Sequence, residues 1–321
     1  MKRELTPENI QELKENQIFV FGSNMNGNHA GGAARLAVEK FGAIMGQAEG
    51  IQGQSYAIPT LDKDMQKVTE EELVVFLGNF GNYANEHPEE EFLLTAIGTG
   101  IAGFDASYMA YMVLRANLPD NVTLPKEFVK IKGYKGFNPD MTCRDFQYEE
   151  GKDYEETGDI RACGNGFHFC LHPLDVFGYY PPAEVGMNKF HEVEGTGDMD
   201  VDTDDTKIAC SKIHIGAELS IKSLVDAAVK FTFEKCKWKK GKTATGDQGA
   251  ASATGKDSIA LAAGYECKAK GAIGCWIVLA ERGEWDGDTY PIKEVKAFEV
   301  DGKKVKADTW YMLVNGELKE V

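Results

Sequence analysis

The chain has 321 residues, a length that favours two domains. Its 35 basic and 51 acidic side chains give a formal net charge of −16, which argues against a protein that coats nucleic acid, because such binding needs basic surface to neutralise phosphates. No apolar run reaches the roughly 20 residues of a membrane-spanning helix, and the polar N-terminus lacks the apolar segment of an export signal. An odd number of cysteines without a CxxC pair fits reduced thiols. We therefore expect a cytoplasmic protein without a membrane partner.

Strand and helix signals alternate in the first half of the chain. Thr6-Pro7 is typical of a helix start, with threonine as N-cap and proline at the first helical position. Thr69 and Glu72 form a capping box before a later helix. The other expected elements are strands at 18–21, 55–58, 92–97 and 121–124 and helices at 33–41, 70–85 and 106–117. This alternation predicts an α/β domain at residues 1–131, with a mostly parallel sheet between helices.

The second half has a different pattern, in which short strand candidates dominate. They cover 166–171, 207–215, 275–280, 294–300 and 309–314. One helix is expected at 220–235. These signals predict an α+β domain at residues 132–321.

A short repeat lies inside this second half. The segments ATGDQGAAS (244–252), ATGKDSIAL (253–261) and AAGYECKAK (262–270) align with a period of nine residues. Glycine recurs at Gly246, Gly255 and Gly264, and alanine at 251, 260 and 269. A glycine-punctuated period of this kind is typical of stacked turns in a small solenoid, and a flexible low-complexity loop is the alternative.

Two strand–glycine–helix units stand out in the first half. In FVFGSNMNGNHAGGAARLAVEKFGA (19–43), a strand leads through several glycines into a helix. FLLTAIGTGIAGF (92–104) repeats the arrangement with a GxGxxG spacing. Glycines let a ligand approach the backbone, and a helix start offers unpaired N–H groups to a phosphate. Either loop alone is also explained by a tight turn, but two in one domain favour a diphosphate held between two helix N-termini.

The two loops resemble those of macrodomains, the ADP-ribose-binding α/β/α family. GSN (22–24) with AGGAA (30–34) is similar to the first signature of that family, and AIGTGIAGF (96–104) to the second. Residues 16–130 as a whole resemble a macrodomain-like family of bacteriophage proteins. The second half resembles a phage-associated domain of unknown function through YKGF (134–137), residues 166–182 and DTWYMLVNGE (308–317).

The resemblance implies a nucleotide site made by both loops. Gly31, Gly32 and Ala33 would hold the distal-ribose side of the diphosphate, Asn24 would face that ribose, and Phe104 would stack near it. The phosphates would be wrapped by Gly98, Thr99, Gly100 and Ile101. Gly22, Ser23 and Gly103 complete the two loops.

Catalysis has weaker support than binding in this sequence. Hydrolytic relatives place an acidic residue after the first glycine loop, where this chain has Ala33, Ala34 and Arg35. General acid–base chemistry needs a carboxylate or an imidazole within hydrogen-bond reach of the proton that moves. The candidates are His29, Glu49 and Asp105, and Asn24 would position the ribose or a water molecule.

Three functions remain open at this stage. The preferred one is a module that binds ADP-ribose or an NAD-derived nucleotide in the host cytoplasm, as a phage counter-defence factor. The alternatives are an ADP-ribosyl glycohydrolase and a protein-interaction module with a host protein partner. No resident cofactor or metal is expected. Four side chains that can ligate zinc lie close together in the sequence, namely Cys163, His168, Cys170 and His172. The sequence does not decide whether they hold a metal.

Overall fold

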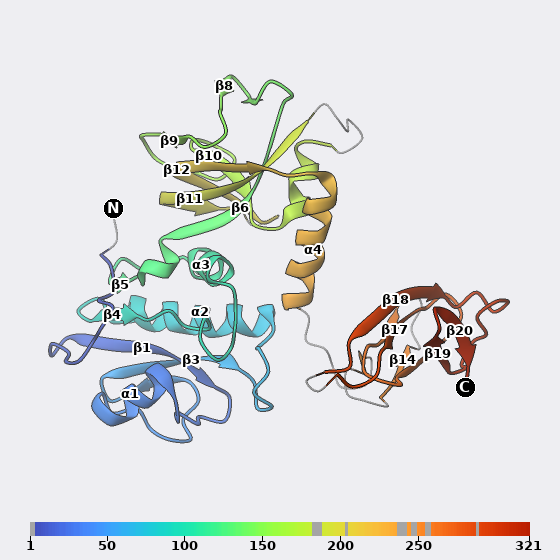
Figure 1. Cartoon of the computed structure of the whole chain (residues 1–321). Coiled ribbons are helices and arrows are strands. Elements are labelled where there is room, and N and C mark those ends of the chain that lie inside the picture. Colours follow the sequence, from blue (N-terminus) through green and yellow to red (C-terminus); the bar gives the residue numbers. More distant parts are fainter. Residues whose placement is uncertain are drawn as a thin grey trace. The chain divides into compact units, whose positions relative to one another are not determined.

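The computed structural model describes residues 4–181, 188–202, 205–235, 243–244, 249–253, 258–286 and 289–321 (Figure 1). They belong to two compact units, one within residues 1–237 and one within residues 238–321. None of the described helices is long and apolar enough to cross a membrane.

The first unit begins with a five-stranded sheet in the order β2-β3-β1-β4-β5. Its strands are β1 (Gln17–Asn24), β2 (Gly50–Gln52), β3 (Ser55–Leu61), β4 (Glu91–Leu94) and β5 (Val122–Thr123). Strand β1 runs parallel to β3 and β4, and β4 runs parallel to β5, whereas β2 is antiparallel to β3. The chain therefore starts in the middle of the sheet and adds strands on both sides of β1.

Alternation along β1 directs its side chains to two cores. Phe19 and Phe21 pack with α1 (Gly32–Lys40) on one face of the sheet. Ile18 and Val20 point to the other face, which is covered by α2 (Glu70–Glu86) and α3 (Ala106–Arg115). Helices α1 and α2 accordingly lie on opposite sides of this sheet (Figure 1).

Two expectations for helix starts have different outcomes. The capping box before α2 is confirmed, because Thr69 Oγ1 accepts the amide of Glu72 at 3.2 Å and the Glu72 carboxylate accepts the amide of Thr69 at 2.7 Å. The helix expected at Thr6-Pro7 is wrong. The amide of Thr6 donates to the carbonyl of Leu124 at 2.8 Å, so this segment is extended and pairs next to β5.

A second sheet follows in the same unit, with the order β10-β6-β11-β12-β9 and all pairings antiparallel. Its strands are β6 (Lys130–Phe137), β9 (Asp153–Glu155), β10 (Phe167–Cys170), β11 (Lys189–Val201) and β12 (Lys207–Glu218). Strand β10 also pairs with β12, so four of the strands close on themselves. One continuous apolar core joins both sheets, from Ile18 to Ile215.

Short elements surround the second sheet. They are the 3-10 helices η1 (Lys126–Phe128) and η2 (Pro173–Gly178), the hairpin of β7 (Thr142–Cys143) and β8 (Phe146–Gln147), and helix α4 (Ile221–Lys235). The boundary that the sequence suggests between residues 131 and 132 falls inside the first unit, near the start of β6. One apolar core joins the segments on the two sides of this boundary. The division into domains at this point stays a prediction.

The second unit contains the repeat as two small sheets, β13-β15-β17-β18 and β14-β16-β19-β20. Their strands are β13 (Thr243–Ala244), β14 (Ala250–Ala253), β15 (Ile259–Ala262), β16 (Lys268–Gly271), β17 (Trp276–Arg282), β18 (Ile292–Glu299), β19 (Tyr311–Val314) and β20 (Glu317–Glu320). Ala251 is paired in parallel with Ala269, two repeats further along the chain.

Each repeat therefore crosses from one sheet to the other, and two repeats make one coil. Ala251, Ala260 and Ala269 are fully buried between the sheets, where only a small side chain fits. In the described part of the repeat, the small solenoid is the correct alternative. Gly246 and Gly255 lie outside the described residues.

The predicted fold class is wrong for the chain as a whole. Strands make up 37% and helices 20% of the structure, and several sheets are antiparallel, so the protein is mostly β rather than an α/β domain joined to an α+β domain. The strands β6 and β11 account for much of the difference. Both carry glycines and charged residues that weaken the strand signal, although their buried positions alternate along much of each strand.

Candidate functional site

The two glycine loops lie next to each other in the structure. A β-carbon added at Gly22, near the end of β1, would be 3.5 Å from the amide nitrogen of Gly98. A β-carbon added at Gly31 would be 3.7 Å from Cδ1 of Ile101. The two loops therefore approach each other at two points, beyond the paired residues of the parallel strands β1 and β4.

Their position in the sheet favours ligand binding. After β1 the chain passes to α1 on one face, and after β4 it passes to α3 on the other face. The connections thus separate at the carboxyl ends of two neighbouring parallel strands. In open sheets, this is the topological switch point at which ligands bind.

Helix α1 begins without a capping side chain. Its N-cap is Gly31, and its first turn contains no acidic residue. The amides of Gly32, Ala33 and Ala34 have no acceptor within the helix, as in any first helical turn. Gly31 and Gly32 are exposed and Ala34 is buried, so an anion would approach this helix start from the side of the two glycines.

The second loop is a tight turn with three exposed residues, Gly100, Ile101 and Gly103. The amide of Phe104 donates to the carbonyl of Gly98, and that of Gly103 donates to Gly100, both at 2.9 Å. Gly100 and Ile101 lie between these bonds, and Ile101 is 81% exposed. Their amides donate to no acceptor among the described residues. Such neighbouring free amides form a concave site for an anion.

The predicted phosphate ligand Thr99 is partly used within the loop, because its hydroxyl donates to the carbonyl of Ala96 at 2.8 Å. The start of α3 is also occupied. Asp105 is its N-cap, and its carboxylate accepts the amide of Tyr108 at 3.1 Å. The geometry consequently offers one helix N-terminus and one free loop, rather than two helix N-termini.

The polar side chains of the first loop hold the loop itself together. Asn24 is buried, its Oδ1 accepts the amides of Asn26 and Asn28 at 3.1 Å, and its Nδ2 donates to the carbonyl of Asn28 at 2.7 Å. Ser23 is also buried and donates to the carbonyl of Ala48. Both residues therefore shape the backbone of the loop.

His29 is buried as well, with 1% of its surface exposed. Its Nε2 lies 3.0 Å from the carbonyl oxygen of Gln47, and its ring packs edge-on against Phe21. If Nε2 carries the proton and donates to this carbonyl, Nδ1 is left without a partner in the described structure. This position makes His29 a core residue below the loop, not a side chain presented to a ligand on it.

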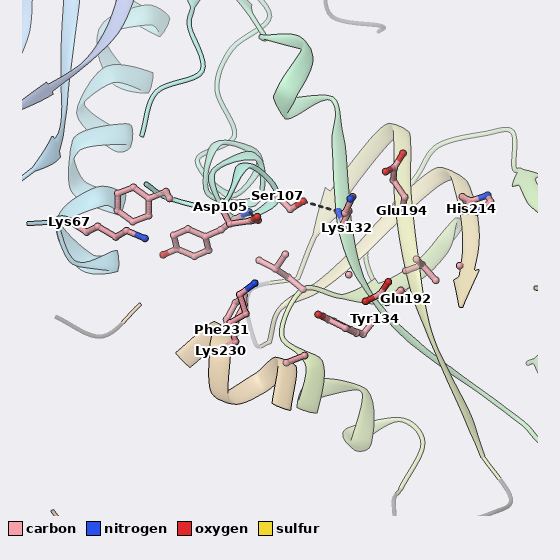
Figure 2. Close-up of a pocket in the computed structure, with 17 residues that line it drawn as sticks. Lys67, Asp105, Ser107, Lys132, Tyr134, Glu192, Glu194, His214, Lys230 and Phe231 are labelled. Carbon is pink, nitrogen blue, oxygen red and sulfur yellow. Dashed lines mark hydrogen bonds between the residues drawn. The ribbon is translucent and has the colours of Figure 1, made fainter. Parts of the chain in front are cut away.

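Asp105 and Phe104 face a cavity of about 410 Å³ between α3, α4 and the second sheet (Figure 2). The ammonium of Lys67 lies 4.9 Å from the ring centroid of Phe104. Ser107, whose Oγ accepts the amide of Lys132 at 3.0 Å, joins α3 to β6 at this cavity. The glycines of the two loops do not line it. Phe104 and Asp105 therefore line a cavity to which the exposed Gly100 and Ile101 do not contribute.

The four possible zinc ligands do not come together as a metal-binding group in the described residues. Cys170 is buried and burial raises the pKa of its thiol, whereas Cys163 is exposed and its Sγ lies 3.1 Å from Asp202. The ring of His172 accepts the amide of Leu174 at the start of η2. A different group, of Glu150, His191 and Glu218, brings its ligand atoms within 4.8 Å of one another in the described residues. Nδ1 of His191 in that group already contacts the carbonyl of Gly216 at 2.9 Å.

Comparison with known proteins gives one match. The model of a family described as a domain of unknown function, DUF7666, matches residues 131–227, which is less than half of the chain. No curated protein matches, and no solved structure matches. The matched segment starts within β6, contains the rest of the second sheet and ends within the first half of α4.

Proposed function

We propose that the two glycine loops bind the diphosphate of ADP-ribose or of a related NAD-derived nucleotide. The observation that carries this proposal is the contact between two exposed glycine loops at the carboxyl ends of β1 and β4. The uncapped start of α1 supplies donors from one side, and the amides of Gly100 and Ile101 supply them from the other. The resemblance of the loop sequences to ADP-ribose-binding macrodomains selects this diphosphate among others.

Binding is favoured over hydrolysis, because the candidate catalytic bases are buried or already hydrogen-bonded within the protein. His29 is buried beneath the first loop, and the carboxylate of Asp105 caps α3 and faces the cavity of Figure 2. The side chain of Asn24 is hydrogen-bonded to the backbone of the loop. A proton-transfer group needs to reach the reacting atoms directly or through one water molecule. The proposal is therefore a module that holds the nucleotide intact.

A matched pair of variants at Gly100 tests the site. A β-carbon added there meets no atom within 4 Å, and the residue does not have a positive φ, so both Gly100→Asn and Gly100→Asp fit without strain. The two side chains differ in charge and hardly in size. A carboxylate at this position repels the diphosphate by about 1–2 kcal/mol at a solvated site, or roughly a tenfold loss of affinity.

The measurement is calorimetric titration of the intact protein with ADP-ribose. We expect binding by the wild type, a small loss with Gly100→Asn and a further loss of about tenfold with Gly100→Asp. Equal affinities of the two variants, or no heat with the wild type, would contradict the proposal. Chromatography of the recovered ligand and of an ADP-ribosylated protein distinguishes the hydrolase, because release of free ADP-ribose would show turnover.

A further inference from the structure

A second cavity, of about 470 Å³, lies inside the segment that matches the family of unknown function. Aromatic rings form much of its lining, among them Tyr148, Phe167, Tyr179 and Tyr180. Its size is within the range of small-molecule sites, and its combination of rings with a few polar groups is typical of such sites. None of the glycine-loop residues contributes to it.

The unusual group in this cavity is the ammonium of Lys135, a residue of β6 that is only 4% exposed. Its Nζ donates to the carbonyl of His168 at 2.8 Å and lies 3.4 Å from Sγ of Cys143. The rings of Phe137 and Tyr148 are within 5.4 Å and 5.3 Å of it. No carboxylate among the described residues forms an ion pair with Lys135.

A buried cation without a counter-charge is costly. Carbonyls and rings stabilise an ammonium only in part, and buried charges in proteins are normally paired. The cost is visible here, because burial lowers the pKa of the Lys135 ammonium. A protein without a use for the charge would be more stable with an apolar side chain of similar length at this position.

One further group lining the cavity also favours an anion. Arg144 is exposed in the β7–β8 hairpin and forms no ion pair with the described residues. The ring of His168 also lines the cavity, but burial lowers its pKa, so it adds no positive charge at neutral pH. Lys207 also lines the cavity, but its Nζ pairs with Oδ2 of Asp202 at 2.6 Å. The cavity lining includes one carboxylate, that of Glu156.

We propose that this cavity binds a small aromatic anion, whose negative group pairs with Lys135 and Arg144 and whose ring packs among the aromatic side chains. The ligand then supplies the counter-charge that the described protein lacks. A planar ring with a phosphate or a carboxylate has both features. This site is separate from the glycine loops, and its ligand is independent of the nucleotide proposed for them.

Pyridoxal 5′-phosphate is a suitable probe, because it is an aromatic phosphate that also carries an aldehyde. The Lys135 amine would attack the aldehyde carbon, a C=N bond would form and water would leave. Added borohydride would then transfer hydride to that carbon and leave a stable secondary amine. Mass spectrometry of a digest of the full-length protein locates the label. Exposed Lys152 in the same unit is the internal reference.

We expect Lys135 to be labelled at least tenfold faster than Lys152. Pyridoxine 5′-phosphate, which lacks the aldehyde, should protect Lys135, and pyridoxine without the phosphate should not. Arg144→Gln alters an exposed side chain and should slow labelling at Lys135 only. Labelling of Lys152 ahead of Lys135 would overturn the proposal, and so would equal protection by pyridoxine and its phosphate.

The Lys135→Met variant separates this site from the proposed function. It should lose the fast labelling and keep the calorimetric heat of ADP-ribose binding, because the glycine loops do not line the cavity. A loss of ADP-ribose binding in a folded Lys135→Met variant would contradict the independence of the two sites.

Discussion

Replacing Gly98 by alanine tests how the second glycine loop is built. Gly98 has a φ of +76°, in the left-handed region that favours glycine. A β-carbon there would lie 3.0 Å from Sδ of Met109 and 3.1 Å from Cδ2 of Phe104. Both neighbours are buried, so neither side chain can move into solvent without a cost. Gly100, two residues later, has neither constraint.

The cost of Gly98→Ala follows from these contacts. The left-handed conformation costs about 1–2 kcal/mol for a residue other than glycine. Overpacking against Met109 and Phe104 adds about 1–3 kcal/mol, and the stiffer unfolded chain offsets about 0.4–1 kcal/mol. We therefore expect Gly98→Ala to lower the free energy of unfolding by about 1–4.5 kcal/mol, and Gly100→Ala to change it by about 0.5 kcal/mol or less.

Urea unfolding measures this difference, and the distribution of tryptophans assigns it to a unit. All four tryptophans are in residues 238–321, so their fluorescence reports the second unit. Far-ultraviolet circular dichroism reports both units. Gly98→Ala should lower the urea midpoint of the first unit, which dichroism detects. The fluorescence transition, which reports the second unit, should stay unchanged. Equal stability of the Gly98→Ala and Gly100→Ala proteins would refute this account of the loop.

Three other changes have defined outcomes. Thr69→Ala removes the capping box of α2 and should cost about 1 kcal/mol in the dichroism transition of the first unit. Ala260→Leu overfills the solenoid interior and should cost about 1–3 kcal/mol, seen by tryptophan fluorescence. Burial lowers the pKa of Lys135 in the folded state. Between that lowered value and about 10.4, the unfolded chain therefore binds more protons than the folded chain. The free energy of unfolding of the wild type consequently rises with pH in this window. Lys135→Met should remove that rise when urea midpoints are compared across the window.

Local patterns in the sequence predicted several elements correctly. The capping box places the start of α2, and the alanines of the nine-residue repeat occupy the interior of the solenoid. These signals succeed because both depend on neighbouring residues. The extended segment at Thr6 is different, because its conformation is determined by a hydrogen bond to Leu124, far away in the chain.

The candidate site shows the same limit. The sequence identified the two glycine loops, and the structure places them in contact through the pairing of β1 with β4. The sequence did not reveal that the side chain of Asn24 hydrogen-bonds the loop backbone or that Asp105 caps α3. Both interactions depend on the folded conformation of the loops. Lys135 was also missed, since a lysine in a strand rich in charge gives no sign of its burial.

Amide hydrogen exchange with and without ADP-ribose tests the proposed nucleotide site, because the ligand would be held by backbone N–H groups. We expect slower exchange in two separate peptides, one with Gly31 to Ala34 and one with Gly98 to Ala102, when the nucleotide is added. The segment 134–180 around the second cavity should exchange at an unchanged rate. Protection in only one loop, or protection confined to that segment, would contradict a diphosphate shared by the two glycine loops.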